Sequence, residues 1–358
     1  MTQNRRFASQ PELAINLDAL IANWQFFKDL GNAEVSAVVK ANAYGLGIEK
    51  CALALHDAGC NIFFVAHLSE GIVLRKMLSW RAKIYVLNGF IGGEIQYFRE
   101  YDLIPVLNNF EQIQSHQDQK TPCAIHIDTG MNRLGIRFDE AEKCEKLLAG
   151  QSVEMIMSHL ACASEPAHTL NDLQLVRFRQ ICDLFPNAQK SLSASAGALI
   201  GPKYHFDLLR PGIGLYGSNP NDNPINPMRP VLTLRAPIIQ LRELKSGEAF
   251  GYGATFTASK TTKIAVIALG YADGFLRSAS NSGFAVIDGV KCPIIGRVSM
   301  DLIALDISEI KTALNCGDMV ELLGANADID EQASSMGTIA YEILTNLGNR
   351  FHRTYSKS

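Results

Sequence analysis

The residues of this sequence that are best suited to chemistry follow short apolar runs. Lys40 closes the run Val35–Val39. Desolvation at such a position lowers the pKa of a lysine, and its neutral amine is then a nucleophile for carbonyl groups. The competing interpretation is that the Lys40 ammonium simply reaches out into solvent. Further polar residues follow later apolar runs, namely Asp128 with Arg133 just beyond it, His159, Ser195 and Arg210.

Two later loops have the composition of phosphate-binding segments. They are Ser195-Ala-Gly197 and Arg210-Pro-Gly-Ile213. Backbone N–H groups beside a glycine can approach a phosphate closely, and the Ser195 hydroxyl adds a further polar group. A reactive lysine together with such loops indicates pyridoxal 5'-phosphate bound through Lys40. Glycine turns of purely structural origin are the alternative explanation.

The segment Gly212–Gly217 also matches the dinucleotide-binding pattern G-x-G-x-x-G. That pattern requires a strand before it and a helix after it. Here a proline-rich segment, 219–230, stands where the helix of such a unit would begin. We therefore reject a dinucleotide site.

The elements that must position these residues alternate between apolar runs and helical patterns. Helical spacing is clear in segments such as Ile48–Ala58 and Thr169–Phe185, and this alternation predicts a parallel sheet covered by helices. Eight strands suit a closed (β/α)8 barrel, whose active-site residues gather at the carboxyl ends of the strands, but an open sheet can also hold eight. The candidate runs are Val35–Lys40, Ile62–Ala66, Lys83–Leu87, Ile104–Leu107, Cys123–Asp128, Val153–His159, Ser191–Ser195 and Asp207–Arg210.

From about Val231 the pattern changes to strand-like runs joined by glycine turns. Asp288-Gly289 between two of these runs is a strong hairpin signal. A single helix is predicted over Ile329–Leu347. We expect an α/β fold, a (β/α)8 TIM-like barrel over residues 1–230 followed by a smaller, mainly β domain over residues 231–358.

The composition is that of a globular protein without specialised surfaces. A net charge of -3 gives no reason to expect nucleic acid or an anionic membrane as partner. The eight cysteines are dispersed, with no C-x-x-C pair, so we expect no metal site. The polar start Met1–Pro11 resembles no secretory signal, and no apolar run is long enough to span a bilayer. We expect a cytoplasmic protein.

Several motifs in this order and spacing resemble the alanine racemase family, and the resemblance covers nearly the whole chain. The stretch Val38-Val-Lys-Ala-Asn-Ala-Tyr-Gly45 is similar to the cofactor-lysine signature of that family. The other matching motifs are Asp128-Thr-Gly-Met-Asn-Arg-Leu-Gly135, Ser158-His159, Arg210-Pro-Gly-Ile213, Gly251-Tyr-Gly-Ala254, Gly270-Tyr-Ala-Asp-Gly274, Gly296-Arg-Val-Ser-Met-Asp301 and Tyr341-Glu-Ile-Leu344.

The resemblance implies a pyridoxal-phosphate-dependent isomerase that interconverts L- and D-alanine and supplies D-alanine for cell-wall peptidoglycan. It implies a head-to-tail homodimer with shared active sites. Lys40 would hold the cofactor and act as one base, and Tyr252 from the partner subunit would be the base on the opposite face. A racemase needs two opposed bases because the proton leaves one face of the carbon and returns on the other.

The remaining site residues are also assigned by the resemblance. The phosphate would be held by Tyr44, Ser195, Gly212, Ile213 and Tyr341. Arg210 would face the pyridine nitrogen of the cofactor, with His159 behind it. Arg133 and the backbone N–H of Met300 from the partner subunit would position the substrate carboxylate. Taken singly, Tyr252, Tyr341 and Met300 are more often packing residues.

Two positions depart from the family pattern. His126 stands where many members have a carbamylated lysine, whose negative charge would steady Arg133; an anion such as chloride could take its place. Ala194 stands where an asparagine often precedes the serine, which removes a polar contact near the cofactor. Both departures concern specificity and rate more than reaction type.

Three other functions compete with this interpretation. A racemase for serine, lysine or several amino acids would differ in pocket size, which the sequence ranks poorly. A non-catalytic pyridoxal-phosphate carrier would need the lysine and the phosphate loops but not the second domain or Tyr252. A metal-dependent barrel hydrolase lacks the clustered ligands it would require.

Overall fold

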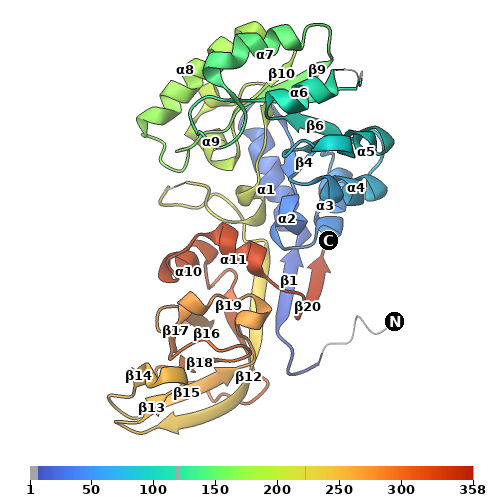
Figure 1. The fold of residues 1–358 in the computed structure, drawn as a ribbon. Coiled ribbons are helices and arrows are strands. Elements are labelled where there is room, and N and C mark those ends of the chain that lie inside the picture. Colours follow the sequence, from blue (N-terminus) through green and yellow to red (C-terminus); the bar gives the residue numbers. More distant parts are fainter. Residues whose placement is uncertain (1–6, 118, 120, 222, 358) are drawn as a thin grey trace. The chain divides into compact units, whose positions relative to one another are not determined.

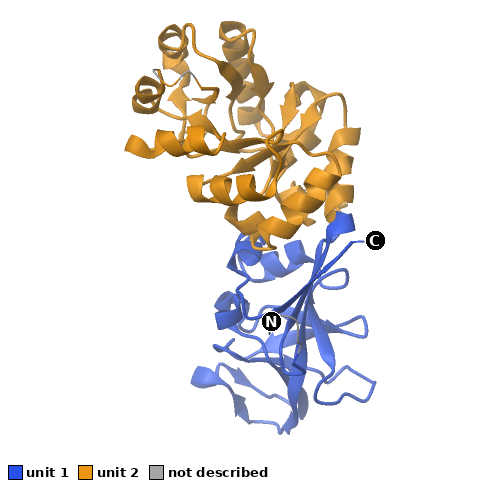
Figure 2. Ribbon diagram, turned by 90° about the vertical axis from the view of Figure 1, so that its right-hand side faces the viewer, with its two compact units in different colours: residues 1–19, 230–358 blue, residues 20–229 orange. Residues whose placement is uncertain are grey.

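The structure is a computed structural model, and it describes residues 7–117, 119, 121–221 and 223–357. The chain forms two compact units, shown in different colours in Figure 2. One comprises residues 20–229. The other combines the described residues up to 19 with those from 230 onward.

The unit of residues 20–229 is built on parallel strands with helices around them (Figure 1). Strands such as β4 and β6 are buried at every position, as parallel strands covered on both faces should be. The strands are β2 (Glu34–Val35), β3 (Ala37–Val38), β4 (Ile62–Val65), β5 (Lys83–Val86), β6 (Ile104–Leu107), β7 (Cys123–Asp128), β9 (Val153–Met157), β10 (Gln189–Ser191) and β11 (Leu208–Leu209), with the short β8 (Ile136–Arg137) beside β7.

Backbone hydrogen bonds close these strands into a barrel. The order β3-β4-β5-β6-β7-β9-β10 is continuous, and β11 pairs with β2. The Ser36 N–H donates to the Leu209 carbonyl at 3.0 Å, and the Arg210 N–H donates to the Ser193 carbonyl at 2.9 Å. Because β11 is thus joined to strands on both sides, the sheet has no free edge there. The predicted (β/α) barrel is confirmed, and the open-sheet alternative is wrong.

The helices of this unit follow the strands in sequence. The 16-residue α8 (Thr169–Leu184) is the longest of those described, and α2 (Lys40–Tyr44), which begins at Lys40, has backbone angles unlike those of an ordinary helix. The helices are α1 (Leu17–Asp29), which begins in the other unit, α2 (Lys40–Tyr44), α3 (Ile48–Asp57), α4 (Leu68–Met77), α5 (Ile95–Glu100), α6 (Phe110–His116), α7 (Ala141–Leu147), α8 (Thr169–Leu184) and α9 (Ser195–Ile200).

The second unit is a largely antiparallel β structure. Its long strand β12 pairs with β1, β15 and β19. The strands are β1 (Glu12–Asn16), β12 (Leu232–Leu244), β13 (Ala249–Phe250), β14 (Phe256–Thr257), β15 (Thr262–Ile267), β16 (Phe284–Ile287), β17 (Val290–Ile295), β18 (Ile303–Asp306), β19 (Met319–Leu323) and β20 (His352–Ser356). The predicted Asp288-Gly289 hairpin joins β16 and β17, with both residues at positive φ, as this tight turn requires.

Two predictions for this unit need correction. The stretch Glu12–Asn16, predicted as part of a barrel segment 1–230, instead lies between β12 and β20, because its alternating burial suits a sheet with one covered face. The single predicted helix over Ile329–Leu347 is two helices, α10 (Ile329–Ser335) and α11 (Ala340–Asn346). Gly337 at a φ of 69° ends α10.

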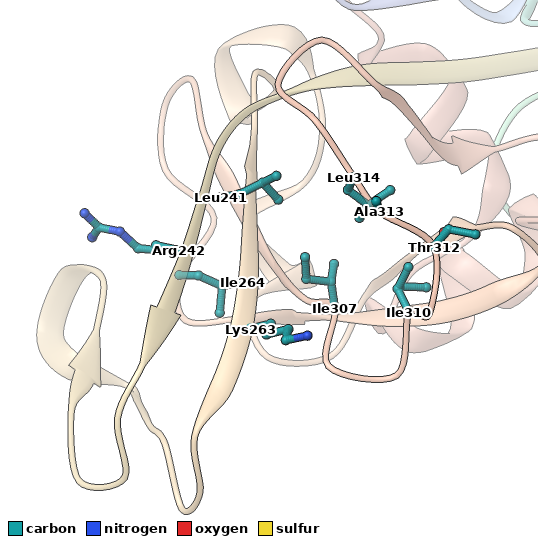
Figure 3. A pocket seen from close by; sticks show the side chains of 9 residues that line it. All are labelled: Leu241, Arg242, Lys263, Ile264, Ile307, Ile310, Thr312, Ala313 and Leu314. Atoms are coloured by element: carbon teal, nitrogen blue, oxygen red, sulfur yellow. The ribbon is translucent and has the colours of Figure 1, made fainter.

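A hollow of about 230 Å³ lies in the second unit, between β12, β15 and the segment 307–314. Its lining is largely aliphatic, and Figure 3 shows the Arg242 side chain pointing away from the other lining residues. Among the described residues that line it there is no site residue predicted from the sequence. The chemistry therefore has to be sought elsewhere.

Candidate active site

The carboxyl edge of the barrel begins with Lys40, two residues after Val38, the last residue of β3. The Val38 N–H donates to the Pro211 carbonyl at 3.0 Å, and the Val39 N–H donates to the Phe64 carbonyl at 2.9 Å. These bonds fix the strand end on both sides. Lys40 therefore leaves the barrel from an immobilised backbone, with its side chain partly buried.

The backbone after Lys40 forms a left-handed helical turn. Ala41, Asn42, Ala43 and Tyr44 all have φ between 52° and 57°. A left-handed turn costs roughly 1–2 kcal/mol per non-glycine residue, because Cβ approaches the following carbonyl oxygen. Hydrogen bonds hold this conformation: the Ala43 N–H donates to Val39 at 2.9 Å, and the Asn42 side-chain oxygen accepts from the Ile48 N–H at 2.8 Å. Such concentrated strain is typical of functional segments.

The Lys40 amine is more acidic than an ordinary lysine. Burial lowers its pKa, the positive charge of Arg133 lowers it further, and the negative charge of Glu70 raises it. The neutral, nucleophilic form is therefore more accessible than in water. The influence of Arg133 also shows that the loop after β7 lies near Lys40.

Tyr44, Ser195 and Gly212 meet at this edge. The Ser195 hydroxyl oxygen accepts from the Gly212 N–H at 2.9 Å and from the Gly214 N–H at 3.2 Å. A Cβ atom on residue 212 would lie 2.4 Å from the Tyr44 Oη, so only glycine fits there. Tyr44 also stacks on Tyr216 with ring centroids 4.6 Å apart. Hydroxyl groups and glycine N–H groups thus converge, with Ile213 next in the chain.

Arg210 is buried at the end of β11 and is held by oxygen atoms. Its Nη2 donates to the Ser158 carbonyl at 2.6 Å and to the Leu192 carbonyl at 3.3 Å, and its Nη1 donates to the Ser191 hydroxyl. Burial lowers the pKa of Arg210 to about 9, so the guanidinium stays charged near neutral pH. A fixed positive charge therefore stands in the wall of the site.

Two histidines close to these cations are held neutral. Burial lowers the pKa of His159 to about 3, with further lowering by Arg210 and Arg133. Burial lowers the pKa of His126 to about 4, again helped by Arg210 and opposed by Asp128. Near neutral pH neither histidine carries charge.

The tautomer of His126 follows from its partner, Asn108. The Asn108 Nδ2 donates to the Leu87 carbonyl at 2.9 Å and to the Val106 carbonyl at 2.7 Å, so its Oδ1 is an acceptor. His126 Nδ1 lies 3.0 Å from that oxygen and must carry the proton. The Nε2 of a neutral His126 is then an acceptor without negative charge. His126 accordingly gives Arg133 no anionic partner.

The other predicted residues, Tyr252, Met300 and Tyr341, belong to the second unit. Their side chains are 72%, 54% and 44% exposed, respectively. Tyr252 stands in a tight turn between β13 and β14, and Tyr341 lies near the start of α11. These side chains are therefore not packing residues of the second unit's own core.

A backbone hydrogen bond and two ion pairs hold the loop that carries Met300. The Ala272 N–H donates to the Met300 carbonyl at 3.0 Å. Arg350 bridges two carboxylates, with Nε 3.1 Å from Asp273 and Nη1 2.8 Å from Asp301. Met300 is thus presented by a braced loop, although its side chain is exposed.

Sequence reasoning missed Glu70, Asn108 and Arg350. Asn108 directly follows an apolar run, the same signal that identified Lys40, and could have been found by it. Glu70 stands in the first turn of a helix, where an acidic residue is common and indicates no site, yet its carboxylate also binds the Ala41 N–H of another segment. Arg350 carries no local signal, because its partners are distant in sequence.

The described part of the chain contains no group of three or more histidine, cysteine or acidic side chains placed to hold a metal ion. No helix within it has the length and apolar character needed to cross a bilayer.

Comparison with known families identifies relatives over both units. Residues 15–220 match the model described as alanine racemase, N-terminal domain, and residues 231–355 match that of the alanine racemase C-terminal domain. A biosynthetic alanine racemase of Agrobacterium fabrum is 42% identical, covering 96% of this chain and 93% of its own length. A catabolic alanine racemase of the same organism is 45% identical, covering 96% of this chain and 91% of its own length.

Solved structures agree. The crystal structure of alanine racemase from Bartonella henselae with covalently bound pyridoxal phosphate superimposes with a TM-score of 0.93 at 36% identity, covering 97% of this chain and 99% of that one. Biosynthetic alanine racemase from Pseudomonas aeruginosa gives a TM-score of 0.92 at 35% identity, with 97% and 99% coverage.

Proposed function

The chain belongs to the alanine racemase family of pyridoxal-phosphate-dependent isomerases, and we propose that Lys40 and Tyr252 are the two bases of its reaction. The observation that carries the proposal is the convergence, at one barrel edge, of a partly buried lysine with a lowered pKa and the cluster of Tyr44, Ser195 and Gly212. These residues fit pyridoxal phosphate: the amine suits its aldehyde, and the hydroxyl and N–H groups suit its phosphate. When bound, the cofactor acidifies the α-carbon of the amino acid by acting as an electron sink.

Lys40 has two tasks in this proposal. Its amine would hold the cofactor, and as a free amine it would take and return the α-proton on one face of the carbon. Its lowered pKa supports the second task, because a base must be neutral before it can accept a proton. Glu70 and Arg133 act on that pKa in opposite directions.

Tyr252 is proposed as the base on the opposite face, contributed by the partner subunit of a homodimer. Its phenol is 72% exposed and stands in a projecting turn of the second unit, which supports a role outside that unit. Free lysine and tyrosine have pKa values of about 10 alike, so the two bases are suited to a reversible reaction. We accordingly propose that the role of the second unit is to supply this base.

The remaining residues are proposed to bind rather than to transfer protons. Tyr44, Ser195, Gly212 and Ile213 hold the phosphate, joined by Tyr341. Ser195 is already aligned by two backbone N–H groups, so its hydroxyl hydrogen is free to turn toward a phosphate oxygen.

Arg210 is proposed to face the pyridine nitrogen, with His159 behind it. A guanidinium that is charged near neutral pH cannot accept a proton and does not readily give one up. Beside a bound cofactor, Arg210 would leave the ring nitrogen unprotonated, which would limit electron flow into the ring and suppress transamination. Arg210→Glu should increase pyridoxamine formation per turnover, measured by chromatography of the released cofactor; an unchanged product ratio contradicts this role.

Arg133 and the backbone N–H of Met300, the latter from the partner subunit, are proposed to position the substrate carboxylate. Arg133 is exposed, yet its charge acts on Lys40, His126 and His159, which supports its placement over the site. The braced Met300 loop supports a role for its backbone rather than its side chain.

We further propose that the enzyme works in the cytoplasm and supplies D-alanine for peptidoglycan. The eight cysteines are free thiols in the structure, which suits a reducing compartment. Both biosynthetic and catabolic racemases are among the similar proteins, so a genetic test is needed. Deletion of the gene should make growth dependent on added D-alanine; a deletion strain with unchanged growth and wall composition contradicts the biosynthetic role.

The direct test of the reaction is optical. Purified protein with pyridoxal phosphate and L-alanine should lose optical rotation over time until none remains, and Lys40→Ala should not. Parallel assays with serine and lysine measure specificity. Persistent rotation with L-alanine, in protein that takes up the cofactor, contradicts the assignment to alanine.

A further inference from the structure

The carboxylate of Glu70, in α4, joins two neighbouring strand ends of the barrel. Its Oε1 accepts from the Ala41 N–H at 2.6 Å. Its Oε2 accepts from the Ala66 N–H at 2.8 Å and from the His67 N–H at 3.0 Å. Ala41 follows Lys40 at the end of the first barrel strand, and Ala66 follows β4, which pairs with β3.

The bond to Ala41 matters because of where the left-handed turn begins. Ala41 is the first of the residues at positive φ, and it directly follows the lysine. Its N–H donates to Glu70, which lies outside the turn. The N–H groups of Ala43 and Gly45 donate instead to the backbone carbonyls four residues earlier, those of Val39 and Ala41. The conformation at Ala41 sets the direction in which the chain leaves Lys40.

We propose that Glu70 is a positioning residue that anchors the left-handed turn at Ala41 and thereby fixes the placement of the Lys40 amine. This inference deepens the role proposed for Lys40 and rests on it. Glu70 does not itself touch the reacting atoms.

The arrangement calls for a carboxylate in particular. Each oxygen faces backbone N–H donors, on one side Ala41 and on the other Ala66 and His67. A glutamine has one oxygen and one NH₂ group, so on one side its NH₂ group would face a backbone N–H, and neither group could accept a hydrogen bond. Glu70→Gln therefore breaks one side of the bridge at almost unchanged size, and it also removes a negative charge.

The negative charge of Glu70 supplies a measurable quantity, the pKa of Lys40, that a change in packing alone would not shift. The charged groups that act on the Lys40 amine are Arg133, which lowers its pKa, and Glu70, which raises it. His159, which feels the charge of Lys40, is itself neutral near neutral pH. Removing the charge of Glu70 should leave Arg133 unopposed and lower the pKa of Lys40 further.

The experiment is competitive acetylation of Lys40 in the full chain after removal of the cofactor, with the labelled peptide quantified by mass spectrometry from pH 6 to pH 11. Acetic anhydride reacts with the neutral amine only. For Glu70→Gln the labelling midpoint should move to lower pH. The rate at a fixed pH below both midpoints should rise, roughly tenfold if the midpoint falls by a full pH unit. An unchanged midpoint and rate overturn the proposal.

Glu94→Gln is the matched control. Glu94 also accepts a backbone N–H three residues earlier, that of Ile91 at 3.0 Å, but a single oxygen suffices there. Its labelling curve for Lys40 should coincide with that of the wild type. A change of the same size in the control would overturn a specific role for Glu70.

A measurement on the unaltered protein keeps the proposal testable if Glu70→Gln does not fold. Hydrogen exchange of the peptide covering residues 40–46 should show a protected Ala41 amide, although residue 41 is exposed. Rapid exchange at Ala41 overturns the anchor. Neither measurement uses racemisation, so loss of the proposed function would appear separately in the optical assay.

Discussion

The two units carry their proposed site residues in contrasting ways. In the barrel, Ser195 and Arg210 are 2% and 3% exposed, and their polar atoms are bound to named partners. In the second unit, Tyr252 and Met300 are 72% and 54% exposed. Ser195 and Arg210 are desolvated and oriented by the chain itself, while Tyr252 and Met300 are oriented mainly through their backbone.

This contrast indicates that the two units contribute to the site in different ways. Perturbed pKa values arise where burial and neighbouring charges combine, as at Lys40 and His159. A tyrosine in an exposed turn acquires such an environment only when something covers it. The proposed partner subunit would supply that cover. One protomer would then contribute the buried, oriented residues of a site, and its partner would contribute the exposed Tyr252 and Met300.

The largest expected effect is at Tyr252, where a substitution should remove activity and leave stability almost unchanged. Tyr252→Phe removes only a hydroxyl from a largely exposed ring, so the free energy of unfolding should change by no more than about 0.5 kcal/mol. Racemisation should fall by roughly 10²–10⁴-fold, as expected for loss of a general base. Urea unfolding and optical rotation measure the two quantities. A variant that stays active removes Tyr252 from the mechanism.

A large stability effect is expected at His126 on acidification. The unfolded chain takes up a proton there near a pKa of about 6.5, while the folded chain resists protonation until a pKa of about 4. Between these values the unfolded state binds more protons, so the free energy of unfolding falls as pH falls. The contribution is on the order of 3 kcal/mol. His126→Asn should show a flatter pH dependence in urea titrations between pH 7 and pH 4; parallel curves for the two proteins contradict it.

A comparable effect is expected from steric conflict at Gly212. Gly212→Ala places Cβ 2.4 Å from the Tyr44 Oη and 3.1 Å from its Cζ. Overpacking of this kind costs about 1–3 kcal/mol. Calorimetry should show a lower Tm, and adding Tyr44→Phe should restore part of the loss by removing the nearer atom. If the double variant is no more stable than the single one, the contact is not the cause.

The smallest stability effect is expected in the second unit, at the ion pair of Arg350 with Asp301. Both side chains are about half exposed, and exposed ion pairs contribute about 0–1 kcal/mol. Asp301→Asn should therefore unfold almost like the wild type, because Arg350 keeps its buried partner Asp273. The KM for alanine should nevertheless rise, since the Met300 loop loses its brace. An unchanged KM would show that the Arg350 bridge does not serve the site.

The sequence predicts most of the barrel because its strands are short apolar runs with polar residues at their ends. Lys40 and Ser195 were found in this way, and the structure places both at the carboxyl edge of the barrel. The strand expected over Ser191–Ser195 proves to end at Ser191, with α9 starting at Ser195, because element boundaries depend on tertiary hydrogen bonds.

Other features depend on contacts between distant segments and leave little local signal. The left-handed turn 41–44 contains no glycine, so no propensity rule points to it. The contact of Tyr44 with Gly212 joins residues far apart in sequence. The place of Glu12–Asn16 in the second unit depends likewise on pairing with β12 and β20.

The central claim, that one protomer supplies Lys40 and its partner supplies Tyr252, is tested most directly by mixing two inactive variants. Lys40→Ala and Tyr252→Phe homodimers should each lack activity. Random subunit exchange makes about half of the dimers mixed, and each mixed dimer has one intact site. Recovery of about a quarter of wild-type racemisation is therefore expected. Mixtures that exchange subunits, as followed by mass spectrometry, but remain inactive would contradict it.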